Sequence, residues 1–186
     1  MNIPCKKKNH VQIPPGLFKA MMALFIFLFF PLFNGWAQGN YAIQANIIYR
    51  FTKYVNWPED KKAGDFVIGI VGDTPLYDEL THFTTNKTAG GRAIVVKKFS
   101  ASASSYNCQI LFISDEESGS IKRIAASTSG MPTLLVSESE GVARKGSCIN
   151  FVVVDDHLKL EINKTAIEKR MLDIATELLS LGIIVK

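Results

Sequence analysis

Cysteine and histidine are scarce in this sequence, and their scarcity excludes whole classes of site. The 186 residues include three cysteines and three histidines. The two histidines beyond residue 37, His82 and His157, stand alone, whereas a zinc site needs three or four ligands at recognisable spacings. Two cysteines in the same stretch are too few for a disulfide scaffold. We therefore expect no metal site.

Motifs of catalysis and cofactor binding are missing as well. The chain has no Gly-x-Ser-x-Gly nucleophile elbow and no complete glycine-rich phosphate loop. Gly69, Gly72 and Asp73 follow one another near a predicted strand, but the third glycine of a dinucleotide fingerprint is absent. We expect no cofactor and no enzymatic activity. A hydrolase whose site the sequence conceals is the enzymatic alternative.

The chain also lacks an excess of charge once its first 37 residues are set aside. It carries 21 basic and 17 acidic side chains, a formal net charge of +4. Lys6, Lys7, Lys8 and Lys19 supply this excess, so the remainder is neutral and holds no basic stretch. Phosphate neutralisation drives nucleic-acid binding, and nucleic acid is therefore excluded as a partner.

The first 37 residues have the pattern of a secretory signal peptide. Three lysines precede an uncharged apolar run over residues 20–33, and Gly35-Trp36-Ala37 follows as a small-x-small cleavage site. The run is shorter than the roughly 18 apolar residues of a membrane span. We predict a signal peptide over residues 1–37, export, and one domain over residues 38–186. An uncleaved N-terminal anchor is the alternative.

Apolar runs of strand length alternate with amphipathic helices along the rest of the chain. Runs that are apolar throughout indicate strands covered on both faces, as in parallel sheets between helix layers. We predict a three-layer α/β fold with a mostly parallel central sheet of five to six strands flanked by helices. Strands are predicted over residues 66–71, 93–99, 109–113, 133–136, 148–154 and 158–162, and helices over 41–57, 76–83, 121–127 and 165–181.

The end of the chain is predicted to form a hairpin and a long helix. Leu158, Leu160 and Ile162 alternate with charged residues, which is typical of a half-exposed strand. This strand is expected to pair antiparallel with the strand before it through a turn at Asp155-Asp156. An apolar stripe over residues 165–181 then predicts one long terminal helix.

Polar residues follow three of the predicted strands where they end. Ligands of open α/β sheets bind beyond the carboxyl ends of the strands, so we expect these residues to line one edge. We call this set the strand-end rim and predict that it binds a small-molecule ligand. The alternative is that the residues are ordinary loops and helix caps. The set comprises Gly72, Asp73, Ser114, Asp115, Ser137 and Glu138.

The predicted hairpin is the second candidate site. An exposed sheet edge with charges beside apolar residues offers backbone and side-chain contacts to a protein partner. The alternative is an ordinary edge protected by its charges. Phe51, Tyr54 and Trp57 either anchor a partner or pack into the core. The predicted partner-binding residues of the hairpin are Asp155, Asp156, Leu158, Leu160 and Glu161.

Cys108 and Cys148 are the two cysteines beyond the leader. An oxidising compartment allows them to form a disulfide, and two separately buried thiols are the alternative.

Six stretches of the chain, in order, resemble the YfiR-like family of bacterial periplasmic proteins. They are residues 45–58 ending in VNWP, 66–73 (FVIGIVGD), 91–96 (GRAIVV), 108–114 (CQILFIS), 146–152 with INF, and 160–163 (LEIN). The resemblance implies a periplasmic regulator that holds an inner-membrane diguanylate cyclase, or a receptor kinase, inactive by binding it. Release of the regulator under redox or envelope stress would raise cyclic di-GMP and favour biofilm formation. A small-molecule-binding periplasmic sensor is the alternative function.

The resemblance also implies a homodimer, and it has one departure. Family members place a cysteine in the first strand that bridges to the cysteine at position 108. Residues 66–71 hold no cysteine, and the aligned position lies near Gly69. A redox switch built on that bridge is therefore not expected in this chain.

Overall fold

The computed structural model describes residues 35–59 and 63–185. The chain divides into two units, Met1–Ala37 and Gln38–Lys186. The predicted signal peptide therefore lies outside the described residues except for its last three positions, and the fold below is that of the second unit. None of the described helices combines the length and the apolar character that crossing a membrane requires.

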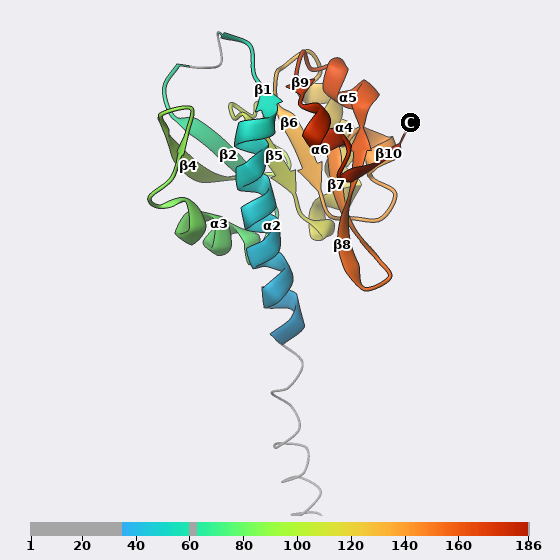
Figure 1. The fold of residues 1–186 in the computed structure, drawn as a ribbon. Coiled ribbons are helices and arrows are strands. Elements are labelled where there is room, and N and C mark those ends of the chain that lie inside the picture. The colour runs from blue at the N-terminus through green and yellow to red at the C-terminus, as the bar shows by residue number, and fades with distance from the viewer. Residues whose placement is uncertain (1–34, 60–62, 186) are drawn as a thin grey trace, which may run out of the picture. The chain divides into compact units, whose positions relative to one another are not determined.

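An eight-stranded sheet forms the centre of the second unit (Figure 1), in the order β10-β8-β7-β6-β5-β2-β4-β3. Strands β4, β2, β5, β6 and β7 run parallel, while β3 and β8 each pair antiparallel with a neighbour. The mixed α/β class with a mostly parallel sheet is confirmed. The strands are β2 (Phe66–Val71), β3 (Thr88–Ala89), β4 (Arg92–Phe99), β5 (Ile110–Ile113), β6 (Leu134–Ser137), β7 (Ile149–Val154), β8 (His157–Asn163) and β10 (Gly182–Val185).

The prediction of five to six strands was wrong because two short strands form only through pairing with distant or turn-connected partners. Strand β3 pairs with β4 across the Gly90-Gly91 turn. Strand β10 lies parallel to β8. A two-residue strand and a four-residue tail are too short to show periodicity in sequence.

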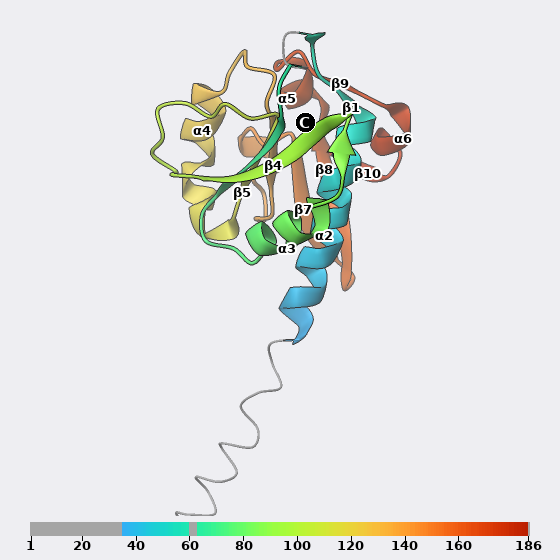
Figure 2. The same cartoon turned by 90° about the vertical axis from the view of Figure 1, so that its left-hand side faces the viewer.

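Helices cover both faces of the sheet. Figure 2 shows α2 and α4 on opposite sides of it. Helix α3 connects β2 to β4 and α4 connects β5 to β6; because these two connections lead in opposite directions along the sheet, right-handed crossovers place α3 and α4 on opposite faces. The helices are α2 (Gly35–Tyr54), α3 (Leu76–Thr84), α4 (Ile121–Ser127), α5 (Lys164–Glu168) and α6 (Thr176–Leu179), with 3-10 helices η3 (Asp115–Ser120) and η4 (Ala143–Lys145).

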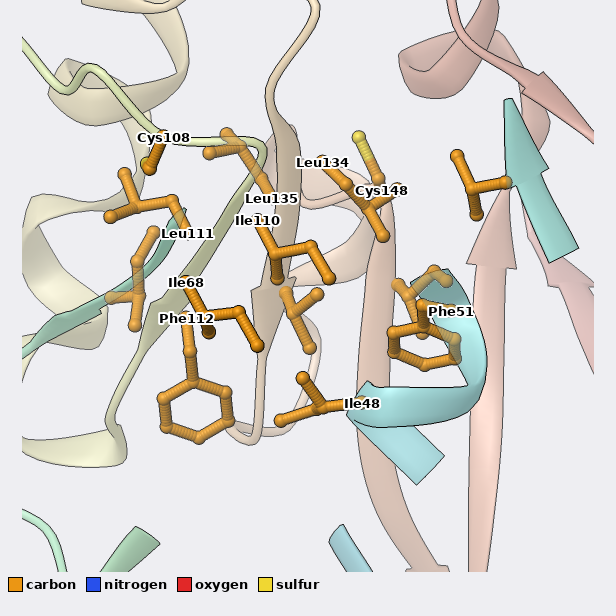
Figure 3. Packing of buried hydrophobic residues seen from close by; sticks show 14 of the residues in the cluster. Ile48, Phe51, Ile68, Cys108, Ile110, Leu111, Phe112, Leu134, Leu135 and Cys148 are labelled. Atoms are coloured by element: carbon orange, nitrogen blue, oxygen red, sulfur yellow. The ribbon is translucent and has the colours of Figure 1, made fainter. Parts of the chain in front are cut away.

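The core lies between α2 and the sheet. Ile48 and Phe51 of α2 are fully buried and lie beside the apolar side chains of the central strands in Figure 3. Phe51 stacks on Phe151 of β7 at a centroid separation of 6.4 Å. Trp57 packs edge-on against Phe66 and donates from Nε1 to the carbonyl of Gln109 at 3.2 Å. Phe51 and Trp57 are therefore core residues, not an aromatic anchor.

The predicted long helix over residues 165–181 was wrong. Helix α5 ends at Glu168, and Met171 has a φ of +57°, a left-handed conformation that stops a helix. Ile174 then lies in β9 (Asp173–Ile174), which pairs antiparallel with β1 (Val55–Asn56). Pairing with residues far back in the chain replaces the continuous helix that local periodicity favours.

The antiparallel hairpin of β7 and β8 forms as predicted, with Val154 opposite His157. Its expected role as the exposed edge of the sheet is correct only for the part of β8 nearest the turn. Strand β10 pairs with β8 along four residues, from Gly182 opposite Leu160 to Val185 opposite Asn163. From Leu160 onward the outer edge of the sheet therefore belongs to β10, while none of the described strands pairs with residues 157–159 of β8 on that side.

Cys108 and Cys148 are both buried, and no disulfide joins them to each other. Cys108 precedes β5 and Cys148 precedes β7, with β6 between the two strands. Two strand spacings amount to about 10 Å, whereas bridged cysteines have Cα atoms within roughly 7 Å. Figure 3 shows the two side chains well apart. The alternative of two separately buried cysteines therefore describes this structure.

Candidate functional site

The strand-end rim residues come together at one edge of the sheet. Strands β2, β5 and β6 are parallel neighbours, with Val71 opposite Ile113 and Ile113 opposite Ser137. The order of strands reverses between β2 and β5, because the chain goes from β2 to β4 on one side and returns to β5 on the other. Open α/β sheets bind ligands at such a switch point. That the rim binds one stays a prediction.

Gly72 and Ser114 form the narrowest part of the rim. Gly72 has a φ of +94°, and a Cβ added there would lie 2.0 Å from Ser114 Oγ. Ser114 N donates to the carbonyl of Val71 at 3.0 Å, which holds the two strand ends together. Glycine at this position therefore serves both its backbone conformation and the close approach of the serine.

Glu138 links the rim to helix α2. Its Oε1 accepts from the backbone N of Asp115 at 3.3 Å, and its Oε2 accepts from Gln44 Nε2 at 3.2 Å. Burial raises the pKa of Glu138, while these two hydrogen bonds oppose the increase and the charge of Asp115 adds to it. Glu138 is thus a carboxyl that protonates more readily than an exposed one.

Three buried polar atoms in the segments that form the rim have no hydrogen-bond partner within the described part of the chain. They are Gln44 Oε1, on the residue that donates to Glu138, and Ser114 Oγ and Ser139 Oγ, on residues that follow β5 and β6. Buried polar atoms are nearly always satisfied in native proteins. These atoms favour the strand-end rim as a site where a polar ligand or water completes the hydrogen bonds.

The remaining rim residues face elsewhere. Asp73 is almost fully exposed and pairs with Lys98 at 3.5 Å, and Asp115 is exposed. Ser137 is buried and donates to Asn150 Oδ1 at 2.7 Å. The structure thus brings Gly72, Ser114 and Glu138 together and directs the two aspartates to solvent.

A buried polar network connects the rim to the hairpin. Asn150 of β7 donates from Nδ2 to the carbonyl of Ser139 and to Glu161 Oε2, both at 2.9 Å. Its Oδ1 receives the hydrogen bond of Ser137. The side chain of Glu161 is therefore hydrogen-bonded to the buried Asn150. It lies on the face of β8 opposite to that of Leu158 and Leu160, because side chains alternate along a strand.

Leu158 and Leu160 line an open apolar groove between α2, β8 and α6. We call it the α2–β8 groove, and its volume is about 590 Å³. Ile43 and Leu181 line it while 52% and 73% of their side chains are exposed. Arg50, Lys159 and Glu177 also line it. The groove combines an apolar floor with charges at its margin, which is the composition of a protein-binding surface.

The tip of the hairpin has an unusual backbone. Asp155 and Asp156 have φ values of +52° and +58°, and both are exposed. Two central residues with positive φ define a type I′ turn, for which Asn-Gly is the preferred sequence. Two aspartates with positive φ make the turn less stable than Asn-Gly would. Residues held in strained backbone conformations are concentrated at functional positions.

Sequence reasoning missed Gln44, Asn150 and Ile43. The apolar stripe expected for the first helix consists of Ile43, Ile47, Phe51 and Val55, widened by Ile48 and Tyr54. Ile48, Phe51 and Val55 are buried as expected, whereas Ile43 is exposed in the groove and Gln44 is buried in its place. The spacing of Ile48, Phe51 and Val55 is that of one helix face, so the sequence could have identified this buried face. No sequence pattern indicates that a glutamine or an asparagine is buried.

The described residues contain no group of His, Cys, Asp and Glu side chains that could hold a metal ion.

A family model described as YfiR/HmsC-like matches residues 41–183, well over half of the chain. The match covers the groove, the hairpin and the strand-end rim. No curated protein matches the chain.

Proposed function

The chain belongs to the YfiR/HmsC-like family, and we propose that it is a periplasmic regulator that represses an inner-membrane signalling protein by direct contact. Members of this family are regulators rather than enzymes. The partner is a diguanylate cyclase or a related receptor. When this protein dissociates from the partner, the cellular level of cyclic di-GMP rises. The leader over residues 1–37 supports export, and the absence of catalytic motifs in the sequence is consistent with a binding role. A homodimer stays a prediction.

The observation that carries this proposal is the α2–β8 groove. Ile43 and Leu181 expose large apolar side chains, and they line the groove together with the buried Phe51 and Leu160. Contiguous exposed apolar surface on a water-soluble domain marks an interaction site. An amphipathic segment of the partner placed in the groove would cover these side chains, as in helix-in-groove recognition.

Charge substitution in the groove tests the proposal. Ile43→Asp and Leu181→Asp place carboxylates where an apolar partner surface would dock, and both positions are exposed enough for the fold to tolerate them. We expect each variant to raise cellular cyclic di-GMP and to lose the membrane partner in a pull-down. Met131→Asp is the matched control, because Met131 is 41% exposed and lies outside the groove.

Folded, exported variants that repress as well as the wild-type protein would remove the groove from the proposal. Recovery of no membrane protein by the wild-type chain would count against the regulatory role as a whole.

A small-molecule-binding sensor is the second candidate function, and the unpartnered atoms of the strand-end rim favour it. Ser114 Oγ, Gln44 Oε1 and Ser139 Oγ offer buried hydrogen-bonding capacity at the strand-end rim and at the glutamine that donates to Glu138. A panel of metabolites in thermal-shift assays should include a compound that raises the melting temperature of the wild-type protein. Ser114→Ala should weaken that shift, whereas no shift with any compound would leave the regulator as the better account.

A further inference from the structure

Four basic side chains from two separate segments surround one cavity. Its volume is about 410 Å³, and Arg144, Lys145, Lys169 and Arg170 line it together with the hydroxyl residues Ser129 and Thr165. We call it the basic cavity. Residues 144–145 belong to η4, and residues 169–170 follow α5. The two pairs of basic residues are far apart in the sequence, and the fold brings them to the same cavity.

Arg170 is the buried charge of the group, with only 4% of its surface exposed. Its Nη1 donates to the carbonyl of Ala166 at 3.0 Å, and its Nη2 donates to the carbonyl of Ala125 at 3.4 Å. Its Nε is buried without a partner, and among the described residues no carboxylate pairs with the guanidinium. Buried arginine is normally compensated by an anion.

No acidic side chain lines the basic cavity. The nearest carboxylate along the chain, that of Glu168, is exposed and pairs with Lys164 at 3.8 Å. The sequence from residue 38 onward has equal numbers of acidic and basic residues, so four bases without an acid form a local excess. Their combined field favours a multiply charged anion over a singly charged one.

We propose that the basic cavity binds a small phosphate-bearing anion. The cavity is large enough for a phosphomonoester and falls within the usual size of ligand pockets. Arg144, Lys145 and Lys169 are exposed and able to donate charge-assisted hydrogen bonds to phosphate oxygens. The buried Arg170 contributes its charge, and Ser129 and Thr165 add neutral donors. The site shares no residue with the α2–β8 groove and does not depend on the proposed function.

Titration calorimetry with inorganic phosphate, at constant ionic strength and with chloride as the reference anion, tests this proposal. The wild-type protein should bind phosphate saturably at one site, and chloride should not compete. The double variant Lys145→Gln/Lys169→Gln should weaken binding by about tenfold or more, since a hydrogen bond to a charged group contributes about 1.5–3 kcal/mol, and 1.4 kcal/mol is tenfold. The matched control is Lys53→Gln/Lys97→Gln, which removes two exposed lysines elsewhere and should bind like wild type.

Equal weakening by both double variants would show general charge screening and overturn the proposal, as would absence of saturable phosphate binding. Vesicles of phosphatidylglycerol distinguish a lipid headgroup from a free phosphate. Cosedimentation that depends on Lys145 and Lys169 without binding of free phosphate would also overturn it. The substituted lysines are exposed, and circular dichroism of each variant verifies that it folds.

Discussion

Gly72 and Ser114 are in such close contact that the side chain at one position limits the residue at the other. An alanine at position 72 would adopt a φ of +94° and place its Cβ against Ser114 Oγ. We expect Gly72→Ala to lower the free energy of unfolding by about 2–4 kcal/mol, the sum of a left-handed backbone and an overlap in a packed site. Urea denaturation measures the change.

A substitution at a second glycine distinguishes the cost of the left-handed backbone from the cost of the overlap with Ser114. Gly90 also has a positive φ, +59°, but a Cβ there would meet nothing within 4 Å. Gly90→Ala should therefore cost only the backbone part, about 1–2 kcal/mol. Addition of Ser114→Ala should restore part of the loss in Gly72→Ala. Equal losses at Gly72 and Gly90 would mean that the contact with Ser114 contributes nothing.

Glu138 makes the stability of the domain depend on pH. Because its pKa is raised in the folded state, folding favours the protonated form. Its contribution is therefore fully present below the ordinary glutamate pKa and is lost as pH rises through the raised value. The difference in unfolding free energy between wild type and Glu138→Gln should shift with pH in that window, to the disadvantage of wild type at higher pH.

Denaturation of both proteins at several pH values above 4.5, the ordinary pKa of a glutamate carboxyl, measures this dependence. Comparing the two proteins cancels the other titrating groups that they share. The amide of Gln44 is able to turn so that its unpartnered Oε1 accepts from the new amide, which preserves the contact in Glu138→Gln. A difference that is constant with pH would contradict the raised pKa.

Residues that matter only through their partners could not be predicted from the sequence. Gln44, Asn150 and Arg170 are polar, buried and far in sequence from the groups they contact. A polar residue inside an apolar pattern is read as exposed, since burial without a partner is unfavourable. The positions of the rim residues were predictable because the carboxyl ends of neighbouring parallel strands lie at the same end of an α/β sheet.

At the scale of one element, a substitution at the tip of the β7–β8 hairpin should change the stability of the domain and its binding to a partner in opposite directions. Replacing Asp155-Asp156 with Asn-Gly supplies the preferred sequence for two positive φ values. We expect this variant to gain about 1 kcal/mol in unfolding free energy, because the new residues adopt the left-handed region more easily. It also removes two exposed carboxylates, so we expect weaker repression and higher cyclic di-GMP.

Thermal denaturation and a cyclic di-GMP assay on the same variant measure the two effects. Asp65→Asn/Asp78→Asn, which removes two exposed charges outside the hairpin, serves as the control for net charge. A stabilised hairpin that represses normally would show that its tip does not contact the partner.

Among the elements that the sequence identified are three strands whose burial is nearly complete. Strands β2, β5 and β6 are buried along almost their whole length, and an uninterrupted apolar run of this length indicates a strand covered on both faces of a parallel sheet. The C-terminal segment failed because Ile174 and Gly182 are placed by pairing with Val55 and Leu160. Its apolar residues at helical spacing include Met171, which is 61% exposed, so their periodicity was not a buried face.

At the scale of the whole molecule, the domain is held together by its core, and within the described residues no disulfide joins Cys108 to Cys148. Gly69, near which the resemblance places the family's first-strand cysteine, lies opposite Leu111. Side-chain carbons of Leu111 and Phe99 fill the space where a Cβ would be, at 2.8 and 2.9 Å. Cys148 is buried, and burial raises the pKa of its thiol, which disfavours the reactive thiolate.

The melting temperature of the protein should therefore be the same with and without a reducing agent. A disulfide typically contributes about 2–4 kcal/mol, and each kcal/mol shifts the melting temperature of a domain this size by about 2–4 °C. Loss of such a bond on reduction would lower the melting temperature by roughly 4–16 °C, which calorimetry resolves easily. A fall of that size would place a disulfide in the protein and make a redox switch possible, whereas equal melting temperatures would argue against regulation of this domain by thiol oxidation.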